Sequence, residues 1–295
     1  MNLPSLDAAV RSALLYADLF DYPLTAAELH RYLEYPIPFP HLETHLNALV
    51  PTADWLVRRG AFYCLAGREG VVAIRKERAA VAAHLWPTAV DYGRRLAALP
   101  FVRLVAVTGS LAVGNTDHTA DIDYLLVTAN DRLWLCRALV IGMVRWAARR
   151  GVTLCPNYFL AERALVLPEQ NLYVARELAQ MVPLAGAACY AQLRAQNRWT
   201  ADFLPNATAA PLPPVPIPPP SRPLPLLEPL LASKVGQPLE QWERTRKIRK
   251  FTTGRPSTAE AAFGPDWCKG HFDGHLARVV QELEGRSGAG KQEMG

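Results

Sequence analysis

The chain has 295 residues, half of them hydrophobic, and carries 32 Lys and Arg against 27 Asp and Glu. A chain of this length can bury a sizeable core and is expected to fold as roughly two or three units. The net charge of +5 is too small by itself to establish nucleic-acid binding. The most apolar window, residues 133–148, is interrupted by Arg137 and Arg145 and is shorter than a spanning helix. It predicts an amphipathic helix, and we expect no membrane partner.

The cysteines and the N-terminus indicate the compartment. Five cysteines are scattered along the chain, and an odd number without regular spacing favours reduced thiols. The first residues lack the charged start and the small-residue cleavage site of a signal peptide. We therefore expect a cytoplasmic protein.

The first 65 residues predict three helices and a hairpin. Residues 5–20 have apolar side chains near helical spacing. Thr25 and Glu28 form the pattern of a capping box, so a second helix should begin at residue 26. Residues 41–49 predict a third short helix. Residues 55–65, with Gly60 near their middle, predict a β-hairpin.

This order of elements is that of a winged helix, which we expect over residues 1–90, followed by a connecting helix to about residue 100. DNA-binding modules of this kind set the third helix in the major groove. Here that helix carries Glu43 and no Lys or Arg, although phosphate contacts supply much of the affinity for DNA. A role in packing or partner recognition is therefore favoured. DNA binding stays open, because five basic residues lie on or after the wing: Arg58, Arg59, Arg68, Arg75 and Lys76.

Residues 105–128, VAVTGSLAVGNTDHTADIDYLLVT, carry the strongest functional signal. An apolar strand should end at Thr108, where Gly109 permits a tight turn and a close approach of the backbone to a ligand. Ser110 should begin a helical turn whose N–H groups and hydroxyl favour a phosphate. Asp121 and Asp123 open a second strand and point to the same side, because side chains alternate along a strand.

With its Gly-Ser turn and an Asp-x-Asp pair eleven residues later, this stretch resembles the polymerase-beta-type nucleotidyltransferase superfamily. The resemblance implies an α/β (α+β) core with a mixed sheet, expected over residues 101–205. It implies that Gly109 and Ser110 bind the β- and γ-phosphates of a nucleoside triphosphate, with ATP the expected nucleotide. Asp121 and Asp123 would be the catalytic residues and would hold two divalent cations, Mg²⁺ or Mn²⁺.

The reaction implied is transfer of a nucleoside monophosphate to an acceptor hydroxyl with release of pyrophosphate. The resemblance does not identify the acceptor, which could be a small molecule, a protein or RNA. Two features depart from the superfamily's pattern. No basic residue follows the Gly-Ser turn, and the strand expected over residues 152–160 contains no acid. Asn157 on that strand, or Glu162 just past it, is the expected substitute for a third metal ligand.

These departures leave an alternative function open. The core could bind nucleotide with weak or lost catalysis, in a regulatory or adaptor protein whose winged-helix-like unit contacts DNA or a protein. Residues 172–193 are helical in pattern and carry Tyr173, Glu177 and Gln180. These side chains could face the nucleotide or the acceptor, although a surface helix is the favoured interpretation.

The last ninety residues change in character. Residues 206–225 are proline-rich and predict a semi-rigid linker. Residues 226–284 predict a C-terminal helical region, and residues 285–295 a disordered tail. The helical region contains a basic run that either forms a solvated face or contacts the triphosphate or the acceptor, supplying the missing cation: Arg246, Lys247, Arg249 and Lys250. Cys268, His271 and His275 have only weakly ligand-like spacing for zinc.

Overall fold

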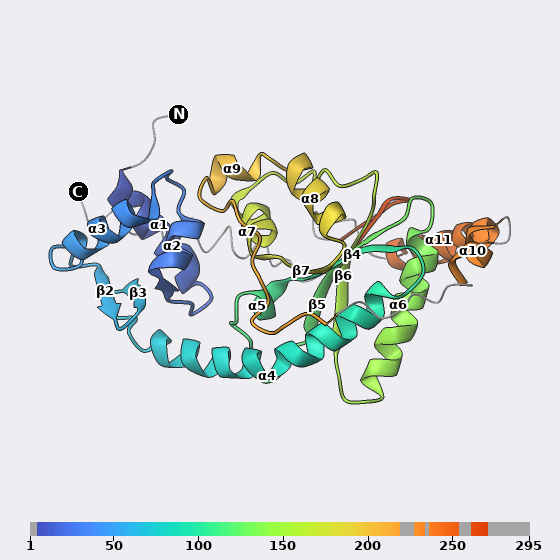
Figure 1. Ribbon diagram of the computed structural model, residues 1–295, viewed down its shortest axis with the longest axis horizontal. Coiled ribbons are helices and arrows are strands. Elements are labelled where there is room, and N and C mark those ends of the chain that lie inside the picture. Colours follow the sequence, from blue (N-terminus) through green and yellow to red (C-terminus); the bar gives the residue numbers. More distant parts are fainter. Residues whose placement is uncertain (1–4, 219–226, 234–235, 254–260, 271–295) are drawn as a thin grey trace.

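The computed structural model describes residues 5–218, 227–233, 236–253 and 261–270. It is a mixed α/β structure with two sheets, one in the N-terminal unit and a larger one in the core (Figure 1). Within the described residues, no helix is both long enough and apolar enough to cross a membrane.

The N-terminal unit contains the predicted helices and hairpin. A short additional strand pairs with the hairpin, which gives an antiparallel sheet of order β1-β3-β2. The Thr25 hydroxyl accepts from the Glu28 backbone N–H, and the Glu28 carboxylate accepts from the Thr25 N–H, so the predicted capping box is confirmed. The elements are α1 (Leu6–Asp18), β1 (Leu24–Thr25), α2 (Ala26–Tyr32), α3 (Phe39–Leu49), β2 (Leu56–Arg59) and β3 (Phe62–Leu65).

The core is built on a six-stranded mixed sheet of order β7-β4-β5-β6-β9-β8. Strands β5 and β6 run parallel, and every other neighbouring pair is antiparallel. The strands are β4 (Val102–Val107), β5 (Ile122–Thr128), β6 (Leu154–Ala161), β7 (Val182–Ala185), β8 (Ala261–Phe263) and β9 (Trp267–Gly270). The helices are α4 (Val71–Ala97), α5 (Gly109–Ala112), α6 (Leu133–Ala148), α7 (Leu172–Gln180), α8 (Ala187–Gln196), α9 (Thr200–Phe203), α10 (Leu227–Ala232) and α11 (Gly236–Thr252).

Helices cover both faces of this sheet because its central strands are apolar on both sides. Val105, Val107 and Tyr124 pack with α4 and α6 on one face. Leu104 and Leu125, which point the other way, pack with α7 and α8. The 27-residue helix α4 runs from the N-terminal unit to the core and lies along both (Figure 1).

Two segments expected to be helical contain strands. Residues 172–193 are interrupted by β7, an edge strand that pairs with β4. The strand ends at Gly186, which has φ +83°. A Cβ at this position would overlap the backbone of Arg103, so only glycine fits there. Residues 261–270, expected within a C-terminal helical region, form β8 and β9, which extend the core sheet beside β6. The α10 and α11 helices agree with the expectation.

Direct hydrogen bonds dock the N-terminal unit on the core. The Tyr22 hydroxyl donates to the Val113 carbonyl over 2.8 Å, and the Arg75 guanidinium donates to the same oxygen over 2.9 Å. The amide of Asn115 donates to the Phe20 carbonyl over 2.9 Å. The guanidinium of Arg31 donates to backbone carbonyls of the core. The loop after α1 is therefore held against the loop after α5.

Candidate metal and nucleotide site

The turn between β4 and β5 brings the Gly-Ser pair against the acidic strand. Thr108 donates its N–H to the Asp123 carbonyl over 3.1 Å, so the end of β4 and the start of β5 stay paired. Gly109 has φ +64°, a conformation that costs little only without a Cβ. A Cβ at residue 109 would overlap the Asp123 carboxylate. The structure therefore brings Gly109, Ser110 and Asp123 together around one cavity.

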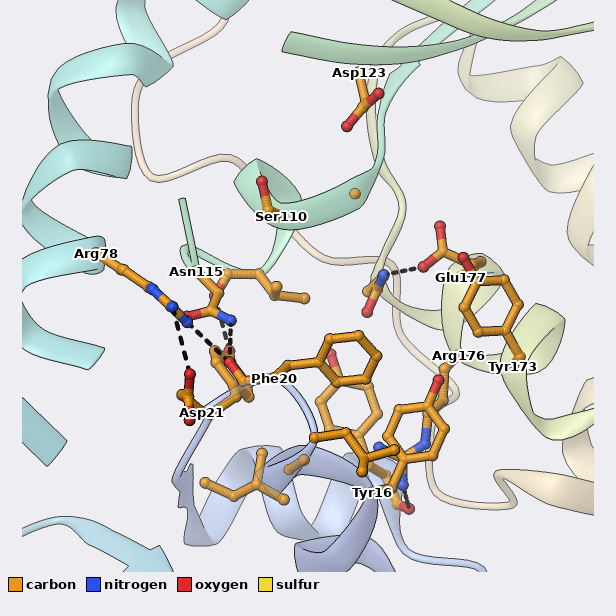
Figure 2. A pocket seen from close by; sticks show the side chains of 18 of the residues that line it. Tyr16, Phe20, Asp21, Arg78, Ser110, Asn115, Asp123, Tyr173, Arg176 and Glu177 are labelled. Carbon is orange, nitrogen blue, oxygen red and sulfur yellow. Dashed lines mark hydrogen bonds and ion pairs between the residues drawn. The ribbon is translucent and has the colours of Figure 1, made fainter. Parts of the chain in front are cut away.

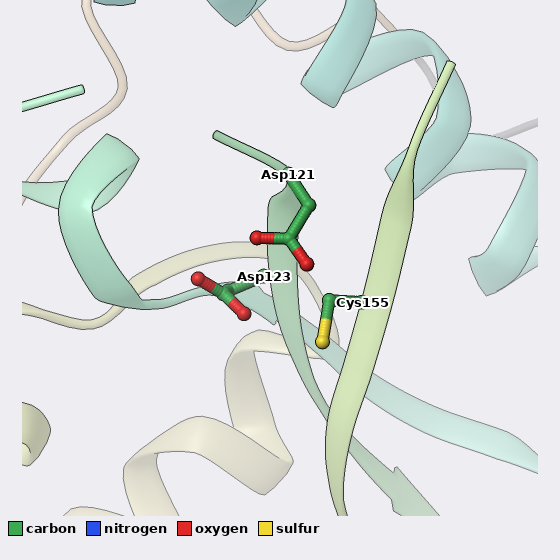
Figure 3. Close-up of side chains that lie close together, drawn as sticks. All are labelled: Asp121, Asp123 and Cys155. Carbon is green, nitrogen blue, oxygen red and sulfur yellow. The ribbon is translucent and has the colours of Figure 1, made fainter. Parts of the chain in front are cut away.

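Three donor groups gather at the start of β5. Asp121, Asp123 and Cys155 each offer an atom, and these atoms all lie within 4.8 Å of one another (Figure 3). Cys155 belongs to β6, where it pairs in register with Asp123 of the parallel neighbour β5. Asp121 lies on the same side as Asp123, as the alternation of side chains predicts.

The two carboxylates share a poorly hydrated site. Burial, and then the neighbouring charge of Asp121, raise the pKa of Asp123 to about 7. The Cys155 thiol and the Asn157 amide both hydrogen-bond to Asp123 and oppose this shift. Carboxylate oxygens are the ligands that Mg²⁺ and Mn²⁺ prefer, and a cation would relieve the repulsion between the pair. The two aspartates fit the expected cations, whereas the thiol is not a ligand for Mg²⁺.

Of the two residues expected to substitute for a third carboxylate, only one lies beside Asp123. Asn157 does lie at the pair, but its Nδ2 donates to Asp123 Oδ1 over 2.8 Å, so it supports the carboxylate through its amide N–H. Glu162 lies at the opposite end of β5 and β6, where its N–H donates to the Thr128 carbonyl and its carboxylate pairs with Arg103 at 3.7 Å. Asp123 is roughly 16 Å away along β5. The expectation that Glu162 reaches the metal site is therefore wrong, because Glu162 follows the end of β6 that lies away from Asp123.

A cavity of about 550 Å³ opens beside these residues, between the core and the N-terminal unit (Figure 2). The core contributes polar groups from the turn, from helix α7 and from the three strands β5, β6 and β9. The N-terminal unit contributes an aromatic wall. The aromatic, polar and charged side chains that line the cavity include Tyr16, Phe20, Tyr22, Tyr32, Arg78, Ser110, Asp123, Tyr173, Arg176, Glu177, Gln180 and Lys269.

Helix α7 presents polar side chains to this cavity, so the surface-helix interpretation is wrong. Tyr173, Glu177 and Gln180 all line it. Burial, and then the charge of Asp123, raise the pKa of Glu177 to about 7, while Lys269 acts in the opposite direction. The Gln180 amide donates to Glu177 Oε1 over 2.6 Å and fixes the carboxylate. A carboxylate with this pKa in a cavity is suited to accept a proton near neutral pH.

The basic run of α11 does not face the cavity. Helix α11 packs against α6. The side chains of Arg246 and Lys247 form ion pairs with the Glu243 carboxylate of the same helix, at N–O distances of 2.6 and 3.9 Å. Arg249 and Lys250 are exposed in the last turn of the helix. None of the four lines the cavity. The interpretation as a solvated face agrees with this placement.

Three other cations line the cavity instead. Lys269, from β9, lies 3.3 Å from Glu169. Arg78 comes from α4 and donates to the Phe20 carbonyl. Arg176 is buried in α7 with its guanidinium 3.7 Å from the centre of the Tyr16 ring, and within the described part of the chain its Nε has no hydrogen-bond partner. Sequence reasoning missed these cations because no local motif marks them.

Cys268 lies in β9, opposite Phe159 of β6, and is buried. Its position in a strand differs from the C-terminal helical region expected for residues 226–284. His271 and His275 lie outside the described residues.

Comparisons with protein-family models, with curated proteins and with solved structures find no match to this chain.

Proposed function

We propose that the protein is a metal-dependent nucleotidyltransferase that moves a nucleoside monophosphate from a nucleoside triphosphate, with ATP the expected one, to an acceptor hydroxyl. One observation carries the proposal: Asp123 lies against the Gly109-Ser110 turn, with Asp121 beside it, at a cavity of about 550 Å³. A cavity of this size is typical of small-molecule sites.

The aspartates supply the metal site of the proposed reaction. Asp121 and Asp123 would hold Mg²⁺ or Mn²⁺, which when bound neutralises triphosphate charge and stabilises the entering and leaving oxygens of an in-line displacement. Asn157 keeps the Asp123 carboxylate oriented by its hydrogen bond. Gly109 and Ser110 line the cavity, where the Ser110 hydroxyl and the backbone N–H groups of the turn would bind the β- and γ-phosphates.

The cavity cations and Glu177 complete the proposed machinery. Lys269 supplies the positive charge that the missing basic residue after the Gly-Ser turn would bring to the phosphates, because it lines the same cavity from β9. Glu177 takes the proton of the acceptor hydroxyl, and we assign it this role because its carboxylate faces the cavity and interacts electrostatically with Asp123. The base would thus come from α7 and not from β6.

The N-terminal unit contributes the acceptor side of the cavity in this proposal. Tyr16, Phe20 and Tyr22 line the cavity. Tyr16 and Phe20 lie across it from Ser110 and Asp123 of the core (Figure 2). The alternative role in DNA binding has weaker support. Helix α3 exposes Glu43 and Asn47 and carries no Lys or Arg, while Arg58 donates to the Gly60 carbonyl and to Asn47.

A second candidate function follows from the β6 strand. It carries Cys155 and Asn157 where a third carboxylate is expected, which favours a nucleotide-binding regulatory or adaptor protein with weak turnover. The two functions differ in one measurable quantity, the transfer of label from an α-labelled triphosphate.

The purified full-length chain is incubated with Mg²⁺ or Mn²⁺ and each α-labelled triphosphate, with and without cell extract. Label should pass to an acceptor or to the protein itself, and the double change Asp121→Asn and Asp123→Asn should abolish transfer. Asp131→Asn is the matched control, because Asp131 is an exposed carboxylate of the same domain that pairs with Arg163. Retained nucleotide binding without any transfer by the wild type would favour the adaptor.

A further inference from the structure

Cys155 distinguishes this acidic pair from one built for Mg²⁺ alone. We propose that Asp121, Asp123 and Cys155 form a mixed carboxylate and thiolate site that selects a borderline transition-metal cation, such as Zn²⁺ or Co²⁺, over Mg²⁺. The inference deepens the proposed function by replacing its expected Mg²⁺ with a transition-metal cation at the same residues, and it rests on that function for the role of the metal in the reaction. The binding preference itself can be measured without nucleotide.

The backbone places the thiol beside the carboxylates. Asp123 and Cys155 are register partners on adjacent parallel strands, and their side chains point to the same face of the sheet. Figure 3 shows the Cys155 side chain beside the two carboxylates. The three donor atoms lie within 4.8 Å of one another, while donors bound to one tetrahedral cation are about 3.5 Å apart. Small side-chain rotations therefore suffice to bring them around a cation.

The environment of Cys155 differs from that of the other cysteines. Cys64, Cys136, Cys189 and Cys268 are buried, whereas Cys155 is partly exposed. Among the residues that the structure describes, this is the one group of three or more potential His, Cys, Asp or Glu ligands close enough to share an ion. The other polar neighbour, Asn157, turns its amide N–H to Asp123. The third protein ligand available is therefore sulfur.

The chemistry of the donor set determines the preferred cation. Mg²⁺ is a hard ion that binds oxygen in near-octahedral geometry, and it gains nothing from a thiol. Zn²⁺ and Co²⁺ bind thiolate and carboxylate together and accept four ligands. On binding, the S–H bond of Cys155 breaks, the proton passes to solvent, and the sulfur lone pair forms the metal–sulfur bond. Asp121 and Asp123 provide two further bonds, which leaves a position for water or substrate.

The alternative is that Cys155 acts only as a small neighbour that donates its S–H to the carboxylates. The two possibilities predict different spectra. A thiolate bound to Co²⁺ gives an intense charge-transfer absorption in the near ultraviolet, whereas a thiol that only packs against the site gives none.

The test is titration of the full-length metal-free chain with Co²⁺, followed by competition with Zn²⁺ and Mg²⁺ in calorimetry. The wild type should show the charge-transfer band. Cys155→Ser should lose that band and bind Zn²⁺ at least roughly tenfold more weakly, because loss of even an outer partner of a metal site has this effect. Cys155→Asp should lose the band and shift the preference toward Mg²⁺.

Cys64→Ser is the matched control, since Cys64 lies on β3 of the N-terminal unit, where its thiol donates to the Val57 carbonyl. It should leave the Co²⁺ spectrum and the Zn²⁺ affinity unchanged. Other thiols and histidines are present in both the wild type and Cys155→Ser, so only the difference between these two proteins counts.

Two results would overturn the inference: a Co²⁺ complex of the wild type without a charge-transfer band, or equal Zn²⁺ affinity in the wild type and Cys155→Ser. The results that would reject the proposed function can be distinguished from these two. A charge-transfer band with no label transfer under any metal would sustain the thiolate site and reject the transferase. Label transfer supported by Mg²⁺, with no band and no effect of Cys155→Ser, would do the reverse.

Discussion

The α-carbon of Gly109 faces the Asp123 carboxylate so closely that a Cβ at residue 109 would overlap Oδ2. Because Thr108 also pairs with the Asp123 backbone, the turn and the acidic strand form one rigid unit. The position of the carboxylate therefore depends on the absence of a side chain at residue 109.

Gly109→Ala should displace the Asp123 carboxylate and lower nucleotidyl transfer by roughly a hundredfold, the effect expected of a misplacement of about 1 Å. Gly114→Ala is the matched control. Gly114 has φ +65°, nearly the same as Gly109, but a Cβ there meets no atom within 4 Å. Both changes should reduce stability by about 1–2 kcal/mol through backbone strain, which thermal unfolding measures. Equal loss of transfer in both variants would contradict the steric explanation.

Stability should depend on pH through Asp123. Its pKa is raised to about 7 in the folded protein, against about 3.9 in an unfolded chain. Between these values the unfolded chain releases this proton first, so the free energy of unfolding falls as the pH rises, by up to a few kcal/mol. Asp123→Asn should therefore stabilise the metal-free protein at pH 8 and give no such gain at pH 4.

Denaturant unfolding in a chelator checks this pH dependence. Asp131→Asn is the comparison, because Arg163 lowers the pKa of Asp131 and the sign of the effect reverses. An equal gain for Asp123→Asn at both pH values would show that the carboxylate is not desolvated.

Glu177→Gln should lower kcat by about 10²–10⁴, the usual contribution of a general base. The pKa of Glu177 is raised to about 7, so wild-type activity should rise with pH through that value as the base becomes ionised. The variant should lose this limb of the profile. Glu162→Gln, at the far end of β6, should leave both the rate and the profile unchanged. A large effect of Glu162→Gln together with no effect of Glu177→Gln would reverse the assignment.

Nucleotide affinity should depend on β9 and not on α11. Lys269→Met should weaken binding of the triphosphate by about tenfold, the equivalent of one charge-assisted hydrogen bond of ~1.5 kcal/mol. Replacing the four basic residues of α11 with Gln should leave the affinity unchanged: Arg246, Lys247, Arg249 and Lys250. Calorimetric titration measures both. Weaker binding by the α11 variant alone would show that this helix, and not β9, supplies the cation.

Local signals in the sequence predicted much of the fold. Helix α6 has the bounds of the apolar window at residues 133–148, and the Thr25 and Glu28 capping box begins α2 as expected. The Gly109-Ser110 turn and the acidic strand were also predicted, because each is encoded within a short stretch and strand alternation fixes the direction of the carboxylates.

Features that depend on distant pairing were not predicted. Cys155 faces Asp123 because of the register between β5 and β6, which no spacing along the chain specifies. Strand β7 and the pair β8 and β9 are only three or four residues long, and their conformation is determined by the neighbouring strand. Lys269 reaches the cavity only because β9 joins the sheet beside β6. The positions of Cys155 and Lys269 in the site thus depend on strand pairing, which a single sequence does not specify.

The place of β9 has a consequence for biosynthesis. Residues 154–161 leave the ribosome well before residues 267–270, by roughly ten seconds at ordinary translation rates. During that interval β6 is an uncovered sheet edge, able to pair with a strand from another nascent chain. The cation that β9 brings to the cavity is missing for the same time. Under the proposed function, a polypeptide still under translation would already display the acidic pair but would bind triphosphate weakly until residues 267–270 have joined the sheet.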